Sequence, residues 1–536
     1  MRQTARNVSL SSLLILAMLG QVLLAHAPSP APQVTTSPNV TFSLPQRFTS
    51  TLAYDYDPAL IQNHDGTVWV FWETGLFSTP WLEDIHYKVY NWTSWSTEQK
   101  AVSGTSQNIA PSVAQLNNGT LYITFSSNRT GNFELYLKRY NPSTGWSADY
   151  QLANNPAADV VSSLLAASDG SLWVFWDRQN STGTSIYSKV YRNGAWSSES
   201  AVASDPAPFQ DQQPSAYQMS DGTIWLAWSQ VQDIHLSKVH VVYKVYNGVS
   251  WGSPVQVTNG NPDTHPNVIQ DSNGTIWMTY SEELSYACTG GGCFQQDLFY
   301  IASMNKGASW STPVNLTNDA GCSDPNCYDD FQPSMAELRD GRIWTFWASN
   351  RDSQNYWDIY YVNSNIQPIH NIAVTSVSGT SVARQGNSAE VDVGLANLGT
   401  YAETFQLTVQ ATNKTTVTVA TRSVYLAAGG SFTLTFLWNT AGVPFGRYTL
   451  SANVPAVTNE YFTWDNSFSG SKVRVVPIAD VNYDGTVNIL DAALVAYAYG
   501  STPGSPKWNP YADLNGDGQI TILDAALVGF WFGTVT

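Results

Sequence analysis

The sequence predicts a mainly β, multidomain protein with a six-bladed β-propeller, then a β-sandwich, then a small α-helical module with two cation loops. Three observations lead to this fold class. A glycine–aromatic strand unit recurs six times, alternating strands without that repeat follow it, and a twelve-residue acidic loop is duplicated near the C-terminus. A chain of 536 residues is long enough for several domains. We expect a leader at residues 1–27 and domains at 28–365, 366–476 and 477–536.

The N-terminus has the order of a secretory signal peptide. Arg2 and Arg6 precede an apolar run at residues 13–24, and Ala25-His26-Ala27 follows with the small residues of a cleavage site. We therefore expect a secreted protein, extracellular or associated with the cell surface. No later stretch is apolar over the 18 or more residues that a membrane span needs, so no transmembrane anchor is expected in the mature chain.

The charge balance disfavours some partners. The formal net charge is −17, cleavage of the leader would bring it to −19, and 12% of the residues are charged. Nucleic acid and anionic membranes would repel such a surface, so no nucleic-acid partner is expected. Polar uncharged ligands such as glycans fit better.

Six glycines each open a strand that reads Gly-x-(Val/Leu/Ile)-aromatic. They stand 53, 51, 52, 52 and 67 residues apart, at Gly66, Gly119, Gly170, Gly222, Gly274 and Gly341. Each copy holds about four short strands divided by turn residues, which is typical of a propeller blade. Trp69 and Trp72 lie three apart on one strand and should therefore face opposite sides of a blade and pack both interfaces. The sixth copy has no fourth strand of its own, and we expect residues 40–44 to supply it.

Residues 303–310, Ser-Met-Asn-Lys-Gly-Ala-Ser-Trp, are similar to the Asp-box of sialidase-type propellers, with Asn in place of the first Asp. Residues 126–136 and 349–360 are similar to repeats of TolB-type propellers. Both resemblances imply the propeller fold. They imply little about chemistry, because Asp-boxes are structural and lie opposite the ligand face.

An acidic or amide residue precedes five of the six first strands at a fixed offset from a proline. The pairs are Asp55/Pro58, Asn108/Pro111, Asp211/Pro214, Asp263/Pro266 and Asp330/Pro333, and the third blade has Asp159/Ser162. These side chains should ring the channel mouth, where they could attract a cation, raise one another's pKa values or cap loop amides. A feature repeated in every blade favours capping. If the propeller is a glycoside hydrolase, which cleaves O-glycosyl bonds between two carboxyl groups, the candidate catalytic residues are Asp211, Asp263, Asp330 and Glu283.

Arg129, Arg178 and Arg351 follow second strands on the same face. Three arginines could clamp a ligand carboxylate, as sialidases do. The rest of a sialidase site is not found in the sequence. Arg129 and Arg351 stand five and seven residues before Glu134 and Asp358, where a local salt bridge is the ordinary explanation, so structural pairing is favoured. The three arginines are candidate ligand-binding residues with structural pairing as the alternative.

Four cysteines, an even number in a secreted chain, predict disulfides. They are Cys288, Cys293, Cys322 and Cys327. The simplest pairing is Cys288–Cys293 with Cys322–Cys327, and cross-pairing stays open. These loops, with Glu283 and Asp330 beside them, form a candidate wall of a ligand site.

Residues 366–476 alternate in the manner of strands. Residues 397–400, 438–440, 446–450 and 465–466 resemble motifs of the CARDB module, an immunoglobulin-like sandwich. The resemblance implies that fold and a spacer or adhesive role.

Residues 480–491 recur 33 positions later as 513–524, and each copy places oxygen-bearing groups at calcium-loop positions. The predicted ligands, with the carbonyl at position 7 in each copy, are Asp480, Asn482, Asp484, Thr486, Asn488 and Asp491, then Asp513, Asn515, Asp517, Gln519, Thr521 and Asp524. In both copies a helix beginning Ile-Leu-Asp-Ala-Ala-Leu-Val follows the loop. The segment 477–536 resembles a dockerin. That resemblance implies two bound Ca²⁺ ions and a cohesin-type protein partner.

One departure from many dockerins bears on the partner. Loop positions 10 and 11, where a hydroxyl pair often reads the cohesin, are Ile489-Leu490 and Ile522-Leu523. The identity of the partner is therefore open.

Two functions remain for the whole chain. In the first, an extracellular dockerin-bearing protein degrades or binds polysaccharide, with a glycan at the propeller. In the second, the propeller and the CARDB-like module form a noncatalytic adhesion or recognition surface for protein or glycan.

Overall fold

The computed structural model describes residues 33–34, 40–50, 53–76, 82–181, 183–205, 209–233, 238–288, 291–317, 328–352, 356–365, 369–458, 460 and 462–536. The chain divides into two compact units, Met1–Gln367 and Pro368–Thr536. The expected signal peptide at 1–27 lies outside the described residues. In the part of the chain that the structure describes, no helix combines the length and apolarity needed to cross a membrane.

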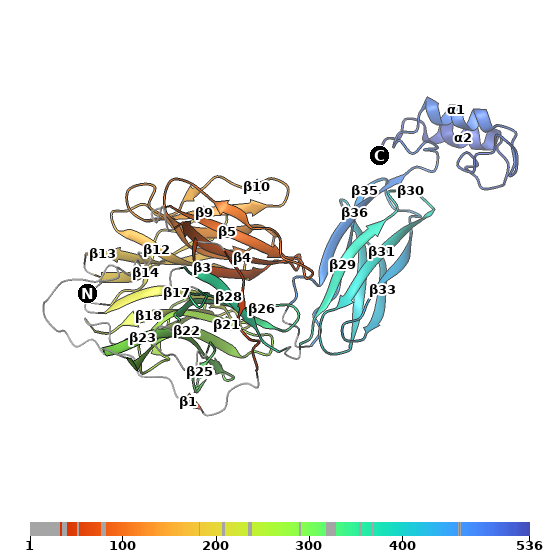
Figure 1. Ribbon diagram of the computed structural model, residues 1–536. Helices are drawn as coiled ribbons and strands as arrows, with labels where there is room; N and C mark the ends of the chain where they lie inside the picture. Colours follow the sequence, from red (N-terminus) through yellow and green to blue (C-terminus); the bar gives the residue numbers. More distant parts are fainter. Residues whose placement is uncertain are drawn as a thin grey trace. The chain divides into compact units, whose positions relative to one another are not determined.

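Six antiparallel sheets build the first unit, which is a six-bladed propeller (Figure 1). Blades one to three contain β3 (Ala53–Gln62), β4 (Val68–Leu76), β5 (Glu83–Tyr90) and β6 (Gln99–Val102); β7 (Asn108–Gln115), β8 (Leu121–Ser127), β9 (Glu134–Asn141), β10 (Gly145–Trp146) and β11 (Tyr150–Gln151); and β12 (Ala158–Ala166), β13 (Leu172–Asn180), β14 (Gly183–Arg192), β15 (Ala195–Trp196) and β16 (Ser200–Ala203). Blades four to six contain β17 (Gln210–Gln218), β18 (Ile224–Val231), β19 (Val239–Tyr246) and β20 (Val255–Gln256); β21 (Asp263–Gln270), β22 (Ile276–Cys288), β23 (Gly291–Ser303) and β25 (Val314–Asn315); and β26 (Asp330–Glu337), β27 (Ile343–Ser349), β28 (Asp358–Asn363) and β2 (Gln46–Arg47).

The ring is closed by strands from both ends of the unit. The first strands of neighbouring blades contact one another all the way round, in the order β3, β7, β12, β17, β21, β26 and back to β3. β2 supplies the outer strand of blade six by pairing antiparallel with β28. Phe42 adds a bridge to Ser364. The closing segment therefore extends a few residues beyond the expected 40–44. A further two-residue strand, β1 (Gln33–Val34), pairs with β24 (Trp310–Ser311).

The six repeated glycines occupy the turns between first and second strands. All six have φ between 75° and 86°, a left-handed conformation that a residue with a Cβ adopts at a cost. This requirement explains why the glycine is the constant member of the repeat.

Tryptophans fill the interfaces between blades. Trp69 packs with Phe125 of blade two, whereas Trp72 packs with Trp344 of blade six, so the two side chains face opposite sides of blade one as expected. Trp72, Trp176, Trp228, Trp277 and Trp347 are fully buried. The high tryptophan content is thus explained by propeller packing.

Two sheets form the sandwich of the second unit. One contains β29 (Ile372–Gly379), β31 (Ser388–Asn397) and β34 (Ser431–Asn439). The other contains β30 (Val382–Arg384), β36 (Ser467–Val476), β35 (Gly446–Asn453), β32 (Glu403–Thr412) and β33 (Thr416–Leu426). Their inner faces enclose an apolar core that includes Val391, Leu407 and Trp438.

Two short helices complete this unit, α1 (Ile489–Ala498) and α2 (Ile522–Trp531). Each begins with a capping box, formed by Asn488 with Asp491 and by Thr521 with Asp524. Val487, Val495, Ile520 and Val528 join their shared core. The capping carboxylates are also the last residues of the predicted calcium loops.

Candidate functional site

The predicted catalytic aspartates of the propeller are enclosed rather than exposed at the channel mouth. Asp211 accepts hydrogen bonds from the Trp228 indole at 2.6 Å and from the Gln230 amide at 3.3 Å, and burial raises its pKa to about 6. Asp330 accepts from the Trp347 indole at 2.8 Å and from Arg351 at 2.6 Å. In both aspartates the carboxylate ties the first strand to the buried tryptophan of the second strand.

The other two members of the predicted set lie in blade five. Asp263 is 2% exposed with the His240 Nδ1 atom 3.8 Å away, and burial raises the pKa of Asp263. Glu283 is half-buried in β22, and its N–H donates to the Pro262 carbonyl at 3.0 Å. The catalytic role of these four residues stays a prediction.

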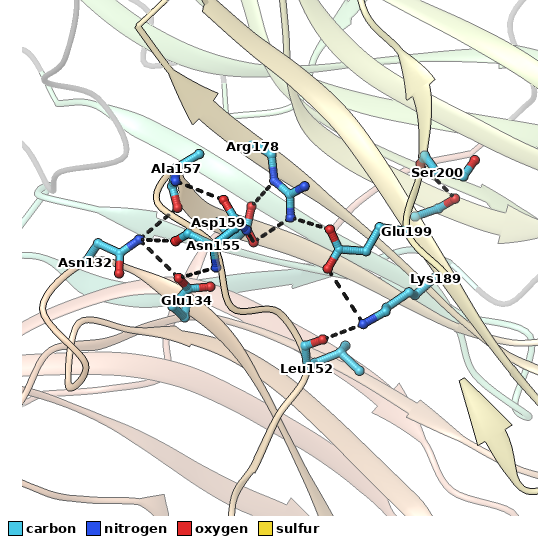
Figure 2. A network of polar contacts seen from close by, with 11 residues as sticks. Asn132, Glu134, Leu152, Asn155, Ala157, Asp159, Arg178, Lys189, Glu199 and Ser200 are labelled. Carbon is cyan, nitrogen blue, oxygen red and sulfur yellow. Dashed lines mark hydrogen bonds and ion pairs between the residues drawn. The ribbon is translucent and has the colours of Figure 1, made fainter. Parts of the chain in front are cut away.

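The three predicted ligand-binding arginines are each bonded to the first-strand residue of their own blade. Arg129 donates to Asn108 at 2.8 Å, and Arg351 donates to Asp330. Arg178 makes two hydrogen bonds to Asp159, at 2.8 and 2.9 Å (Figure 2). The three guanidinium groups also lie over aromatic rings of the second and third strands of the same blades. This repeated pattern favours structural pairing over a shared ligand clamp.

The predicted disulfides lie outside what the structure describes, which excludes Cys322, Cys327 and the side chains of Cys288 and Cys293. What is described is the hairpin of β22 and β23, which runs to Cys288 and Gly291.

A second set of side chains near the axis was not singled out from the sequence. Every first strand has a bulge immediately before its proline or, in blade three, Ser162. The six bulge residues have φ between 42° and 60°: Asp57, Ala110, Val161, Gln213, His265 and Gln332. Backbone in this region is strained for residues other than glycine and is often found at functional sites.

Three of the bulges are hydrogen-bonded to the preceding blade, by the residue that follows its second-strand tryptophan. The Ala110 N–H donates to Glu73 at 2.7 Å, and the Gln213 N–H donates to Asp177 at 2.8 and 3.0 Å. His265 N–H likewise donates to Ser229 at 3.1 Å. Capping of a bulge amide is therefore the ordinary role of this position.

Blade one keeps this capping bond and differs from the other blades because three carboxyl groups gather there. The half-buried Asp57 hydrogen-bonds the buried Glu73 side chain, and Glu83 interacts with both. Burial raises the pKa of Asp57 and that of Glu83 to about 7 each, and it raises the pKa of Glu73 well above its ordinary value. General acid–base catalysis uses a protonated carboxyl group beside an ionised one. The sequence signal that could have found this site is Asp57 at the bulge followed by Glu73 at the capping position, since no other blade has an acid at both.

In the C-terminal module, both predicted cation loops are folded around their last aspartate. The Asp491 carboxylate accepts from the N–H groups of Val481, Asn482 and Asn488, at 2.7, 3.2 and 2.8 Å. Asp524 repeats the arrangement in the second loop with Leu514, Asn515 and Thr521.

The first-position aspartates are also in place. Asp480 Oδ2 accepts from the Gly485 N–H at 2.9 Å, while its buried Oδ1 has no hydrogen-bond partner. Asp513 accepts from Gly516 and Gly518. A buried carboxylate oxygen without a donor fits a cation ligand, so the donor set of the loops suits Ca²⁺. Within the described residues no three His, Cys, Asp or Glu side chains converge as a metal cluster, and the loops would need amide, carbonyl and water oxygens as well.

The helices after the loops expose apolar side chains in matched pairs. The pairs, 33 residues apart and 56% to 77% exposed, are Ile489/Ile522, Leu490/Leu523, Tyr497/Phe530 and Tyr499/Phe532. Soluble domains seldom leave so many large apolar side chains in water without a partner. We call these eight residues the paired apolar faces.

Comparison with known protein families identifies the C-terminal domain. Residues 478–529 match the dockerin type I domain, and the C-terminal segment is a dockerin. No curated protein sequence matches the chain.

Solved structures resemble the two β domains. A Penicillium chrysogenum α-L-arabinanase complexed with arabinobiose is 14% identical, with 63% of this chain and 98% of that chain covered and a TM-score of 0.44. The NanB sialidase from Streptococcus pneumoniae is 11% identical, with 60% and 70% covered and a TM-score of 0.44. A CARDB domain from Pyrococcus furiosus is 24% identical over 21% of this chain and 99% of that domain, with a TM-score of 0.18. At these identities the likeness concerns the fold and says nothing of activity.

Proposed function

We propose that this chain is an extracellular docking protein whose dockerin binds a cohesin-type partner in the presence of calcium and whose propeller cleaves or binds glycans. The observation that carries the proposal is the pair of folded acidic loops, each with a buried carboxylate at position 12 and followed by a helix with an exposed apolar face. Two Ca²⁺ ions, one in each loop, would hold these helices in place, because the loop carboxylates repel one another until a cation neutralises them.

The partner would meet the paired apolar faces. Leu490 and Leu523 stand where many dockerins carry hydroxyl groups, and both are more than half exposed. Burial of these side chains would supply about 25 cal/mol per Å² of apolar surface removed from water. A cohesin with an apolar recognition surface therefore fits this dockerin better than one that reads hydroxyl groups.

The propeller would act on glycans at the Asp57–Glu73–Glu83 cluster. Burial raises the pKa of Glu73 well above its ordinary value and the pKa values of Asp57 and Glu83 to about 7, so carboxyl groups suited to act as acid and as base stand side by side. Glycoside hydrolysis needs that combination. Asp211, Asp263, Asp330 and Glu283 remain the alternative catalytic set.

A noncatalytic recognition protein is the second candidate. It is favoured by the carboxylates and arginines of the propeller face, which largely satisfy one another, as in the pair Arg351–Asp330. In that case the propeller would retain a ligand without changing it.

One experiment on the full chain separates these functions. Sialylated, pectic and neutral glycans are incubated with the wild type, and sugar release and retention on the insoluble forms are recorded together. Asp57→Asn and Glu83→Gln are compared with Asp263→Asn and Asp330→Asn. Loss of release by about 10²-fold or more in the first pair alone would assign the axial cluster, and loss in the second pair alone would assign the alternative set. Retention without release would support the recognition protein. If the protein neither releases sugar nor is retained on any glycan, a glycan function is contradicted.

Docking is tested separately with immobilised type I cohesin domains. We expect binding at roughly 2 mM Ca²⁺, a concentration that saturates most calcium loops, and we expect the binding to be lost in EGTA. Equal binding with and without calcium would contradict the proposal.

A further inference from the structure

We propose that the sandwich keeps the first calcium loop folded in the absence of metal, through Arg384 and Arg474, and that the two loops of the dockerin are therefore inequivalent. The second loop, residues 513–524, would depend on calcium. The inference concerns the sandwich and the dockerin, which lie in one compact unit, Pro368–Thr536. It stands whether or not the propeller is an enzyme.

Arg474, from β36, reaches the backbone of the first loop with both ends of its guanidinium group. Nη1 donates to the Asp484 carbonyl at 3.0 Å, and Nη2 donates to the Tyr483 carbonyl. A Cβ at Gly485 would lie 2.5 Å from Arg474, so the loop passes against the guanidinium with no space to spare. This forked contact fixes the middle of the loop, where two predicted metal ligands are held.

Arg384, from β30, holds the start of the same loop. It is 4% exposed, donates to the Asp480 carbonyl at 3.2 Å and lies over the rings of Tyr483 and Tyr511, 4.9 and 5.3 Å from their centroids. The carboxylates that act on this buried cation belong to Asp480 and Asp491. Burial lowers the pKa of Arg384, and these two predicted calcium ligands offset part of that effect.

The loop backbone is adapted to this contact at position 4. The second loop has Gly516 there with φ of 71°, whereas the first has Tyr483 with φ of 62°. A tyrosine is strained in that conformation and glycine is not. The Tyr483 ring packs edge-on against Tyr511 at 5.4 Å and carries Arg384 on its face, and these contacts offset the strain.

The negative charge of the loops explains why the two arginines matter when no metal is bound. Each loop contains three aspartates, and their mutual repulsion opens a metal-free loop. Two guanidinium groups offset that repulsion in the first loop. For residues 513–524 the structure, where it describes the chain, contains no hydrogen bond or ion pair from a lysine or arginine.

Amide hydrogen exchange on the full chain tests the inference with internal controls. Val481 and Leu514 donate to the equivalent aspartates at 2.7 Å, and Gly485 and Gly518 donate to the first aspartates at 2.9 Å. In EGTA we expect the first-loop amides to exchange at least about tenfold more slowly than their second-loop counterparts. In saturating Ca²⁺ both sets should be protected. Equal exchange of the two loops in EGTA would overturn the proposal.

Three variants locate the cause. Arg384→Ala/Arg474→Ala should bring first-loop exchange in EGTA to the rate of the second loop, while Arg422→Ala, an exposed arginine on β33, should leave it unchanged. Tyr483→Gly removes the platform of Arg384 without touching the sandwich and should act in the same direction. Protection in Ca²⁺ shows that each variant folds. A first loop that stays protected in EGTA in both the double variant and Tyr483→Gly would refute the role of the arginines.

Discussion

Arg178 and Asp159 form a forked ion pair at the edge of blade three, with Nε–Oδ1 and Nη2–Oδ2 distances of 2.8 and 2.9 Å (Figure 2). Asp159 is fully buried, and Arg178 also contacts Glu199 at 2.8 Å. Lys189 forms an ion pair with Glu199 and donates a hydrogen bond to the Leu152 carbonyl. The Nε–Nη2 edge of the guanidinium group is therefore occupied by carboxylates of the protein itself.

Arg178→Ala should therefore destabilise the propeller by about 3 kcal/mol, because it leaves the Asp159 carboxylate buried without its partner. Arg178→Lys should cost less, since lysine restores the charge but not the fork. Urea unfolding followed by tryptophan fluorescence measures both. If Arg178→Ala instead kept wild-type stability and lost retention of sialylated glycans, the ligand-clamp role would be the correct one.

The pH dependence of propeller stability can be predicted from Glu337. The N–H and hydroxyl of Ser272 donate to this carboxyl group at 2.6 and 2.8 Å, and burial, with Asp271 nearby, raises its pKa to about 8. An unfolded glutamate titrates near 4.3. The raised pKa of Glu337 therefore contributes its full stabilisation of the folded state below about pH 4.3, and this stabilisation is lost as the pH rises through 8.

We expect the Tm of the propeller to be lower at pH 8 than at pH 5. Burial also raises the pKa values of Asp55 and Asp211 to about 6, which acts in the same direction. Glu337→Gln keeps an oxygen for Ser272 and does not titrate, so it should reduce the difference in Tm between the two pH values. A Tm that rises from pH 5 to pH 8 would show that Glu337 is ionised throughout.

Most of the fold could be predicted from the sequence because its determinants are local. The six repeated glycines mark turns that require positive φ, and Trp69 and Trp72 alternate across a strand. Closure of the ring was also predictable from the missing fourth strand, although the strand itself lies at Gln46–Arg47.

The axial site was harder to predict because its partners come from different strands and blades. Glu73 meets Asp57 across paired strands of blade one and the Ala110 N–H across the interface with blade two, so two folded blades are needed to bring these three groups together. Arg384 is likewise 96 residues from the carbonyl of Asp480 that it contacts. By contrast, the calcium loops could be found from the sequence because all their predicted ligands lie within twelve residues.

The number of Ca²⁺ ions bound per chain tests whether both predicted loops bind calcium. The wild type should bind two Ca²⁺ ions per chain in equilibrium dialysis, one for each set of oxygen ligands. Asp491→Ala and Asp524→Ala should each bind one ion, and helical circular dichroism should fall because each aspartate also caps a helix. Asp392→Ala, a half-buried sandwich residue that accepts from Thr435, is the control and should bind two. Two ions in all three variants would place calcium elsewhere.

The paired apolar faces supply the last prediction. Leu490 and Leu523 are 58% and 59% exposed at equivalent places, and a partner that covers them removes both from water. Leu490→Asp/Leu523→Asp would force that partner to bury two unpaired carboxylates. We expect at least a hundredfold weaker binding to a type I cohesin at constant Ca²⁺. Leu437→Asp makes the same change at a 71% exposed leucine of β34 and should bind as the wild type does. Calcium stoichiometry of two in the double variant would show that the loops are intact. Wild-type affinity in that variant would mean that the partner binds another surface, and the apolar faces would then need a different occupant.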